Sequence, residues 1–240
     1  MTLTELANFI CTKLSDTDAA SVTACKSYIN RRYQMIWDSA LWTETLGIVT
    51  QPTLAAETET VLSTAPSITF YQSASAPTTF ADFAVAAKFT RTGNDDGYEM
   101  IGQDWISFFQ IDPNMWNDVA NRRANPFNFI NLPKNGSGYA RLKLVPVPDV
   151  AGSVYVLAKL KWVTLGDNDS PCLRGIDNAL LAFAEGDMLE RARKYAQAQV
   201  KYTESAAQVE VMRSIETGQQ QKNFSIIPCD IGDNSLMDIP

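Results

Sequence analysis

The spacing of apolar residues changes twice along this 240-residue chain. Near the N-terminus, apolar residues recur every three or four positions, which is the period of one face of an α-helix. Between residues 46 and 165, short apolar runs rich in Thr, Val and Phe are broken by Pro- and Gly-containing turns, which is typical of β-structure. From about residue 176 the helical period returns. The sequence therefore predicts an α+β fold, a helical bundle carrying a β-rich inserted domain.

Two helices are predicted within residues 1–45. The first carries Thr2 and Glu5 at the spacing of a capping box, which marks the start of a helix. Its apolar face consists of Leu3, Leu6, Ile10 and Leu14. The second helix has the most regular apolar stripe in the chain. That stripe consists of Val22, Cys25, Ile29, Tyr33, Ile36 and Ala40, with Trp37 and Leu41 beside it.

Residues 46–165 are predicted to form the β-rich insert. Turn signals separate seven candidate strands, of which the last two have the strongest β pattern. Residues 146–152, with two prolines and a glycine, are predicted to join those two strands as a hairpin connection. The fifth candidate strand is expected to be interrupted near Gly102. The candidate strands cover residues 46–51, 60–63, 67–72, 84–90, 98–111, 139–147 and 153–163.

The C-terminal helices of the bundle are predicted within residues 166–218. Asp187 with Arg191, and Glu190 with Lys194, place an acid four residues before a base, which supports a helix. We expect two helices with a break near residues 195–202, and a single long helix is the alternative. The second apolar stripe, out of phase with the first, consists of Tyr202, Ala206, Val209 and Met212.

Residues 219–240 are predicted to form an extended C-terminal tail. This segment is too short and too rich in Pro and Gly to fold by itself, yet its apolar side chains are costly to expose to water. They could be buried by docking on the same chain, or by strand addition or insertion into a groove of another chain. We favour the second interpretation. The candidate partner-binding residues are Phe224, Ile226, Ile227, Pro228, Ile231, Leu236, Met237 and Ile239.

Charged residues on the predicted helices are candidates for contacts between subunits. Glu185, Asp187 and Glu190 could also be read as paired carboxylates for acid–base catalysis. Their helical spacing beside basic residues favours a solvated or inter-subunit face instead. The inter-subunit candidates are Arg31, Arg32, Asp187, Glu190, Arg191, Arg193 and Lys194.

Composition removes several classes of function. The chain has no His, which excludes Ser-His and Cys-His nucleophiles and His-based metal sites, so no catalytic residue, metal or cofactor is predicted. Its formal net charge of −7 disfavours binding to nucleic-acid phosphates. No apolar run is long enough for a membrane helix, and no signal peptide is recognisable, so we expect folding in a cytoplasm. Four scattered cysteines, Cys11, Cys25, Cys172 and Cys229, are expected to be reduced and mostly buried.

Three stretches of the chain, taken in order, point to a known family. They are YINRRYQMIW at 28–37 with LW at 41–42, LKLVPVPD at 142–149 with AG at 151–152, and LGDNDSP at 165–171 leading into 176–195. Together they resemble the head–tail connector (adaptor) proteins of tailed bacteriophages. The first is similar to the aromatic-rich helix before the β insert of that family, the second to its l-x-P-x-P hairpin, and the third to its entry into the C-terminal helices. The resemblance covers about two-thirds of the chain, and residues 60–130 have no counterpart in it.

The resemblance implies a structural protein of the virion neck, assembled in the host cytoplasm. It implies a homo-oligomeric ring, commonly of about twelve subunits, through which DNA passes without specific binding. The tail would reach the portal protein, and the insert would face the next tail or neck protein. The alternatives are another neck or tail-completion protein of the same particle and, less favoured, a carboxylate-based hydrolase with its site in the insert.

Overall fold

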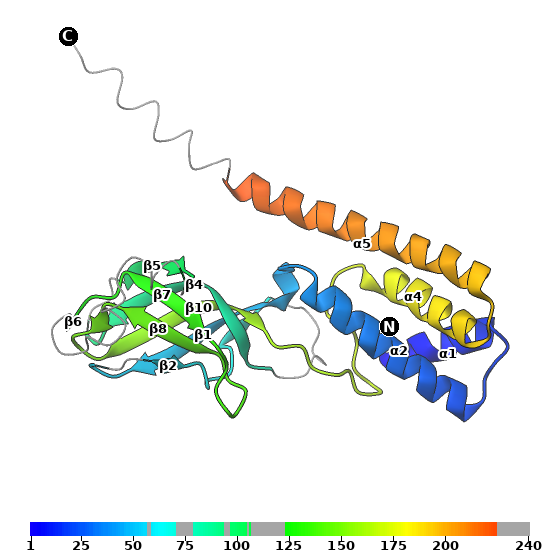
Figure 1. The fold of residues 1–240 in the computed structure, drawn as a ribbon, viewed down its shortest axis with the longest axis horizontal. Helices are drawn as coiled ribbons and strands as arrows, with labels where there is room; N and C mark the ends of the chain where they lie inside the picture. The colour runs from blue at the N-terminus through cyan, green and yellow to red at the C-terminus, as the bar shows by residue number, and fades with distance from the viewer. Residues whose placement is uncertain (57–58, 71–78, 94–96, 105, 107–122, 225–240) are drawn as a thin grey trace, which may run out of the picture. The chain divides into compact units, whose positions relative to one another are not determined.

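The protein is α+β, with helices and a β domain, as the sequence predicts (Figure 1). The chain divides into two compact units. The helical unit contains Met1–Thr43 and the chain from Thr164 onward, and the β unit contains Glu44–Gln72 and Pro77–Val163. The computed structural model describes residues 1–56, 59–70, 79–93, 97–104, 106 and 123–224.

Two helices, α1 (Leu3–Lys13) and α2 (Ala19–Asp38), begin the helical unit, as predicted. The Thr2 hydroxyl accepts a hydrogen bond from the backbone N of Glu5 at 3.2 Å, and the Glu5 carboxylate accepts one from the backbone N of Thr2 at 2.8 Å. This reciprocal pair is the predicted capping box. The buried members of the two predicted apolar faces are Leu3, Leu6, Ile10, Cys25, Ile29, Tyr33, Ile36 and Trp37.

Two further helices, α4 (Ile176–Arg191) and α5 (Tyr195–Phe224), follow the β unit in the sequence. The described chain thus contains two C-terminal helices and not one. The break falls at Arg193, slightly before its predicted position. Arg193 has a φ of 60°, in the left-handed region that α-helices do not use. α5 continues through Phe224, so the predicted start of the extended tail at residue 219 is wrong.

The acid–base pairs predicted within α4 are replaced by other contacts. Asp187, expected to pair with Arg191, accepts a hydrogen bond from Nε of Arg32 in α2 at 2.8 Å. Lys194, the expected partner of Glu190, lies beyond the end of α4. An ion pair at i,i+4 on an exposed helix contributes only about 0.2–0.5 kcal/mol of stability. The Asp187 carboxylate therefore binds the better-placed arginine of another helix instead.

α4 contacts each of the other three described helices, α1, α2 and α5. Small buried residues on α4 let its neighbours approach closely. A Cβ atom added at Gly186 would lie 2.7 Å from Cε1 of Tyr202 in α5, so glycine is needed at this crossing. The small buried residues of α4 are Ala179, Ala182, Ala184 and Gly186.

The described strands of the β unit form one eight-stranded mixed sheet and one two-stranded sheet. The order in the large sheet is β2-β8-β7-β5-β4-β10-β1-β3, and β6 pairs with β9. A short 3₁₀ helix, η1 (Thr43–Thr45), precedes the first strand. The strands are β1 (Leu46–Thr53), β2 (Thr60–Val61), β3 (Ile68–Thr69), β4 (Ala81–Arg91), β5 (Gly97–Gln103), β6 (Arg123–Ala124), β7 (Asn128–Leu132), β8 (Arg141–Val145), β9 (Val147–Pro148) and β10 (Gly152–Leu160).

The large sheet curls around an apolar core (Figure 1). β10 pairs antiparallel with β1 on one side and with β4 on the other. Because side chains alternate between the faces of a strand, Val154, Val156 and Ala158 of β10 share one face. All three are buried in the same cluster as Phe89 and Phe129. The core of the β unit therefore lies on the inner face of the curled sheet.

Part of the predicted strand pairing is wrong. The hairpin predicted at residues 146–152 does not join paired strands, because β8 pairs with β2 and β7 whereas β10 pairs with β1 and β4. The unpredicted strand β7 pairs in parallel with β5. The strand predicted over residues 98–111 with an interruption near Gly102 ends at Gln103 in β5, beside the predicted interruption, and residues 107–111 lie outside the described residues.

Candidate interaction surface

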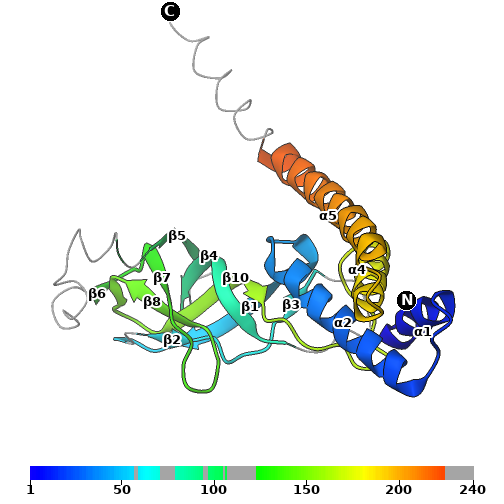
Figure 2. The same cartoon turned by 45° about the vertical axis from the view of Figure 1, so that its right-hand side comes forward.

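α5 is the element that leads to the predicted partner-binding tail. With 30 residues against 16 in α4, it is about 45 Å long beside a helix of about 24 Å. Figures 1 and 2 both show α5 beginning against α4 and continuing beyond it. Phe224 is its last residue. The other candidate tail residues, Ile226, Ile227, Pro228, Ile231, Leu236, Met237 and Ile239, lie outside the described residues.

The outward side of α5 carries large apolar side chains. Val200, Val211 and Ile215 are 65%, 59% and 56% exposed. Their spacing of 11 and 4 residues keeps them near one line along the helix. Scattered apolar residues are ordinary on a protein surface, whereas a line of them on one helix marks a surface suited to a partner.

The inward side of α5 is less apolar than the predicted stripe suggests. Val209 is buried, as predicted, but Ala206 is exposed and Ser205 is buried in its place. Among the α5 side chains that the structure describes, the buried ones are Ala198, Ser205 and Val209. Packing of α5 therefore depends on small residues and on polar contacts.

A network of polar contacts in the helical unit joins α2, α4 and α5. Nε of Arg32 donates to Oδ2 of Asp187 at 2.8 Å, and Nη2 of Arg32 donates to Oδ1 of the same carboxylate. The Tyr202 hydroxyl lies 2.8 Å from Oδ1 of Asp187 and 2.6 Å from Oε2 of Glu190. Two predicted inter-subunit candidates, Arg32 and Asp187, thus bind each other inside one subunit.

Aromatic rings complete this network. The guanidinium carbon of Arg32 lies 5.1 Å from the ring centroids of both Phe183 and Tyr202, a cation–π arrangement. Burial, together with the two carboxylates, raises the pKa of the Tyr202 hydroxyl above its ordinary range. The hydroxyl therefore stays protonated and remains a hydrogen-bond donor. Sequence reasoning missed Tyr202 as a polar partner because it was assigned to an apolar stripe.

The other charged candidates lie on the surface. Arg31, Arg191, Arg193 and Lys194 are exposed, and the last three cluster around the turn between α4 and α5. These four side chains remain available for contacts between subunits, which stays a prediction.

Glu185 does not form a carboxylate pair with Asp187. It is buried, and its Oε2 lies 2.7 Å from Nζ of Lys13 in α1 and 3.6 Å from Nζ of Lys201 in α5. Glu185 thus bridges α1 and α5 through two lysine ammonium groups. The three carboxylates that could be read as an acid–base site therefore each contact another kind of side chain, and their geometry favours structural roles.

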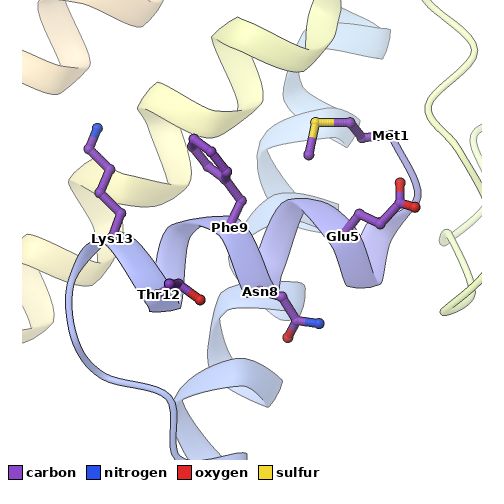
Figure 3. Close-up of a pocket in the computed structure, with 6 residues that line it drawn as sticks. All are labelled: Met1, Glu5, Asn8, Phe9, Thr12 and Lys13. Atoms are coloured by element: carbon purple, nitrogen blue, oxygen red, sulfur yellow. The ribbon is translucent and has the colours of Figure 1, made fainter.

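A shallow depression runs along α1 (Figure 3). In Figure 3 the side chains of Phe9 and Lys13 extend from the same side of the helix. Phe9 is 52% exposed and Met1 is 45% exposed. Because its lining residues are Met1 and residues of α1 alone, the depression is open and does not enclose a small molecule. The lining residues are Met1, Glu5, Asn8, Phe9, Thr12 and Lys13.

Other classes of site are absent from the described part of the chain. There, no group of three or more His, Cys, Asp or Glu side chains is placed to hold a metal ion. None of its helices is long and apolar enough to cross a membrane. Cys11 and Cys25 are buried thiols, as predicted, and burial raises the pKa of Cys25 to about 12. Cys229 lies outside the described residues.

Comparison with models of known protein families finds no match for this chain, and comparison with curated proteins finds no significant relative.

Proposed function

We propose that this protein is a head–tail adaptor of a tailed bacteriophage, a structural subunit that forms a ring between the portal and the tail. The observation that carries the proposal is the order of the parts. Two helices precede the β unit in the sequence, and two more helices follow it. The last helix then leads directly into a segment rich in apolar residues. The same order underlies the resemblance to the adaptor family.

In this proposal the four helices form the wall of the ring as a bundle, and subunits meet through bundle surfaces. Two features support an assembled state. Val200, Val211 and Ile215 expose apolar area on the outward side of α5. Arg191 and Arg193 are exposed near the turn between α4 and α5 and can pair with acids of a neighbour. The ring holds about twelve copies, which cyclic symmetry permits through one repeated interface.

The C-terminal tail binds the portal protein in this proposal. Residues 225–240 contain six Ile, Leu or Met side chains, which are Ile226, Ile227, Ile231, Leu236, Met237 and Ile239. Such a segment, joined to a long helix, can reach a partner and bind it through its apolar side chains. The net charge of −7 suits a lumen through which DNA slides, because like charges repel. The proposal includes no catalytic role and no cofactor.

Removal of the tail tests the proposal. A chain truncated after Phe224 keeps α5 complete, and we expect it to fold like the full chain but to lose binding to purified portal rings. Co-sedimentation measures the binding. The double substitution Ile226→Asp and Ile227→Asp should have the same effect as truncation, since buried aspartates without partners are strongly unfavourable.

The substitutions Ser225→Asp and Asn234→Asp provide the matched control, because they add the same charge at polar positions. We expect them to leave portal binding unchanged. Normal portal binding by the truncated chain would contradict the proposed role of the tail. Electron microscopy of the particle, by locating the ring that this chain occupies, distinguishes an adaptor from another neck or tail-completion protein.

A further inference from the structure

The two halves of α5 are held to the helical unit by different contacts. The proximal half, residues 195–209, includes the buried side chains Ala198, Ser205 and Val209. It also carries Tyr202, which contacts Asp187. Apolar burial and a charged hydrogen-bond network therefore act together on this half.

The distal half, from residue 210 onward, is held much less. The structure describes its side chains over residues 210–217, and none of these is buried. Arg213 Nε has no hydrogen-bond partner although the atom is buried, and the same holds for Gln208 Oε1 at the border of the two halves. A buried polar atom without a partner loses its hydrogen bonds to water and gains none in return. Packing of this half against the helical unit therefore carries an unfavourable free-energy contribution.

One residue of the distal half reaches a partner outside α5. Oε1 of Glu216 accepts a hydrogen bond from the backbone N of Thr43 at 2.9 Å and a second one from the Thr43 hydroxyl. The other polar contacts that the structure describes for this half stay within α5, namely Arg213 with Glu210 and Ser214 with the backbone of Val211. Hydrogen bonds to a carboxylate are stronger than those between neutral groups.

We infer that Glu216 and Thr43 form a latch that holds the distal half of α5 against the helical unit, and that this half also populates a released state. In the released state Arg213 Nε gains water as a partner, while the proximal half stays docked through Tyr202 and Val209. The latch belongs to the helical unit, and the inference does not depend on the proposed function.

Hydrogen–deuterium exchange on the full chain tests the latch. In the wild-type protein, amides of residues 212–217 should exchange faster than those of residues 199–206. Glu216→Ala removes both hydrogen bonds and should accelerate exchange in the distal half by about tenfold, with the proximal half unchanged. Thr43→Val removes only the hydroxyl donor and should have a smaller effect. Alanine is a stronger helix former than glutamate, so lower helix propensity cannot explain faster exchange.

Glu210→Ala is the matched control, because Glu210 is on the same half but its ion pair with Arg213 stays within the helix. We expect little change in exchange for this variant. Two results would overturn the inference. One is unchanged exchange of residues 212–217 in Glu216→Ala. The other is equal acceleration of both halves, which would show that α5 opens as one unit.

Discussion

At the scale of single residues, apolar positions were easier to predict than polar partners. The stripe from Cys25 to Ile36 is buried as its spacing requires, because burial follows from helical periodicity alone. Arg32 was predicted to contact another subunit, yet it reaches Asp187 of the same chain beside two aromatic rings. A long side chain can cross the border of its helix face, so periodicity does not determine the partner of a charge.

Arg32→Ala should weaken the helical unit by about 1–3 kcal/mol, less than for a fully buried ion pair because the Arg32 and Asp187 side chains are 21% and 10% exposed. The loss arises because the part-buried Asp187 carboxylate would lose its bidentate hydrogen-bond partner. Arg32→Lys should recover little of the stability that Arg32→Ala loses, since a lysine can neither make the bidentate contact with Asp187 nor stack on the aromatic rings equally well. Urea denaturation followed by the helical circular dichroism signal measures the change.

Arg31→Ala is the control for that measurement, because Arg31 is the exposed neighbour on the same helix. Its effect should stay within about 0.5 kcal/mol. Equal destabilisation by the two alanine substitutions would show that the network contributes nothing beyond the loss of a surface arginine.

At the scale of elements, the sequence specified which segments are helices or strands better than it specified their neighbours. Strands β1, β4 and β10 lie where apolar runs between turn signals predicted them. The pairing of β8 with β2 and β7 was missed, because alternation reports burial and carries no information on which strand lies alongside. The close crossing of α4 and α5 was likewise missed, since Gly186 is a weak helix former and gave no sign of its neighbour Tyr202.

Gly186→Ala tests that crossing. In a helix interior this substitution normally stabilises by about 1 kcal/mol, because alanine has the higher helix propensity. Here the added Cβ would meet the Tyr202 ring at 2.7 Å, and we expect a net loss of about 1–3 kcal/mol instead. Thermal and urea unfolding, followed by the helical circular dichroism signal, measure the sign of the change in the free energy of unfolding.

The same substitution in a Tyr202→Ala background gives the internal control. With the ring removed, Gly186→Ala should become neutral or stabilising. Destabilisation of the same size in both backgrounds would mean that the cost arises elsewhere, and the crossing of α4 and α5 would need another explanation.

At the scale of the whole molecule, strand register explains how a β unit can interrupt a helical one. β1 is the first strand of the β unit in the sequence and β10 is the last, and the two pair antiparallel with Leu46 opposite Lys159. Paired Cα atoms in such a ladder lie about 4.5–5.5 Å apart. The chain therefore enters and leaves the β unit at neighbouring points, so the insert adds little constraint on the helices before and after it.

This geometry predicts that the β unit folds by itself. A fragment of residues 44–163 contains every strand of the large sheet and its apolar core, and its two ends are held together by β1 and β10. We expect a cooperative unfolding transition and a dispersed amide NMR spectrum. The complementary chain, in which a short Gly-Ser linker replaces residues 46–160, should keep its helical signal and the stabilising contact of Arg32 with Asp187. A disordered fragment together with an intact linker chain would show that the β unit needs the helices to fold. Loss of structure in both would contradict the division into two independent units.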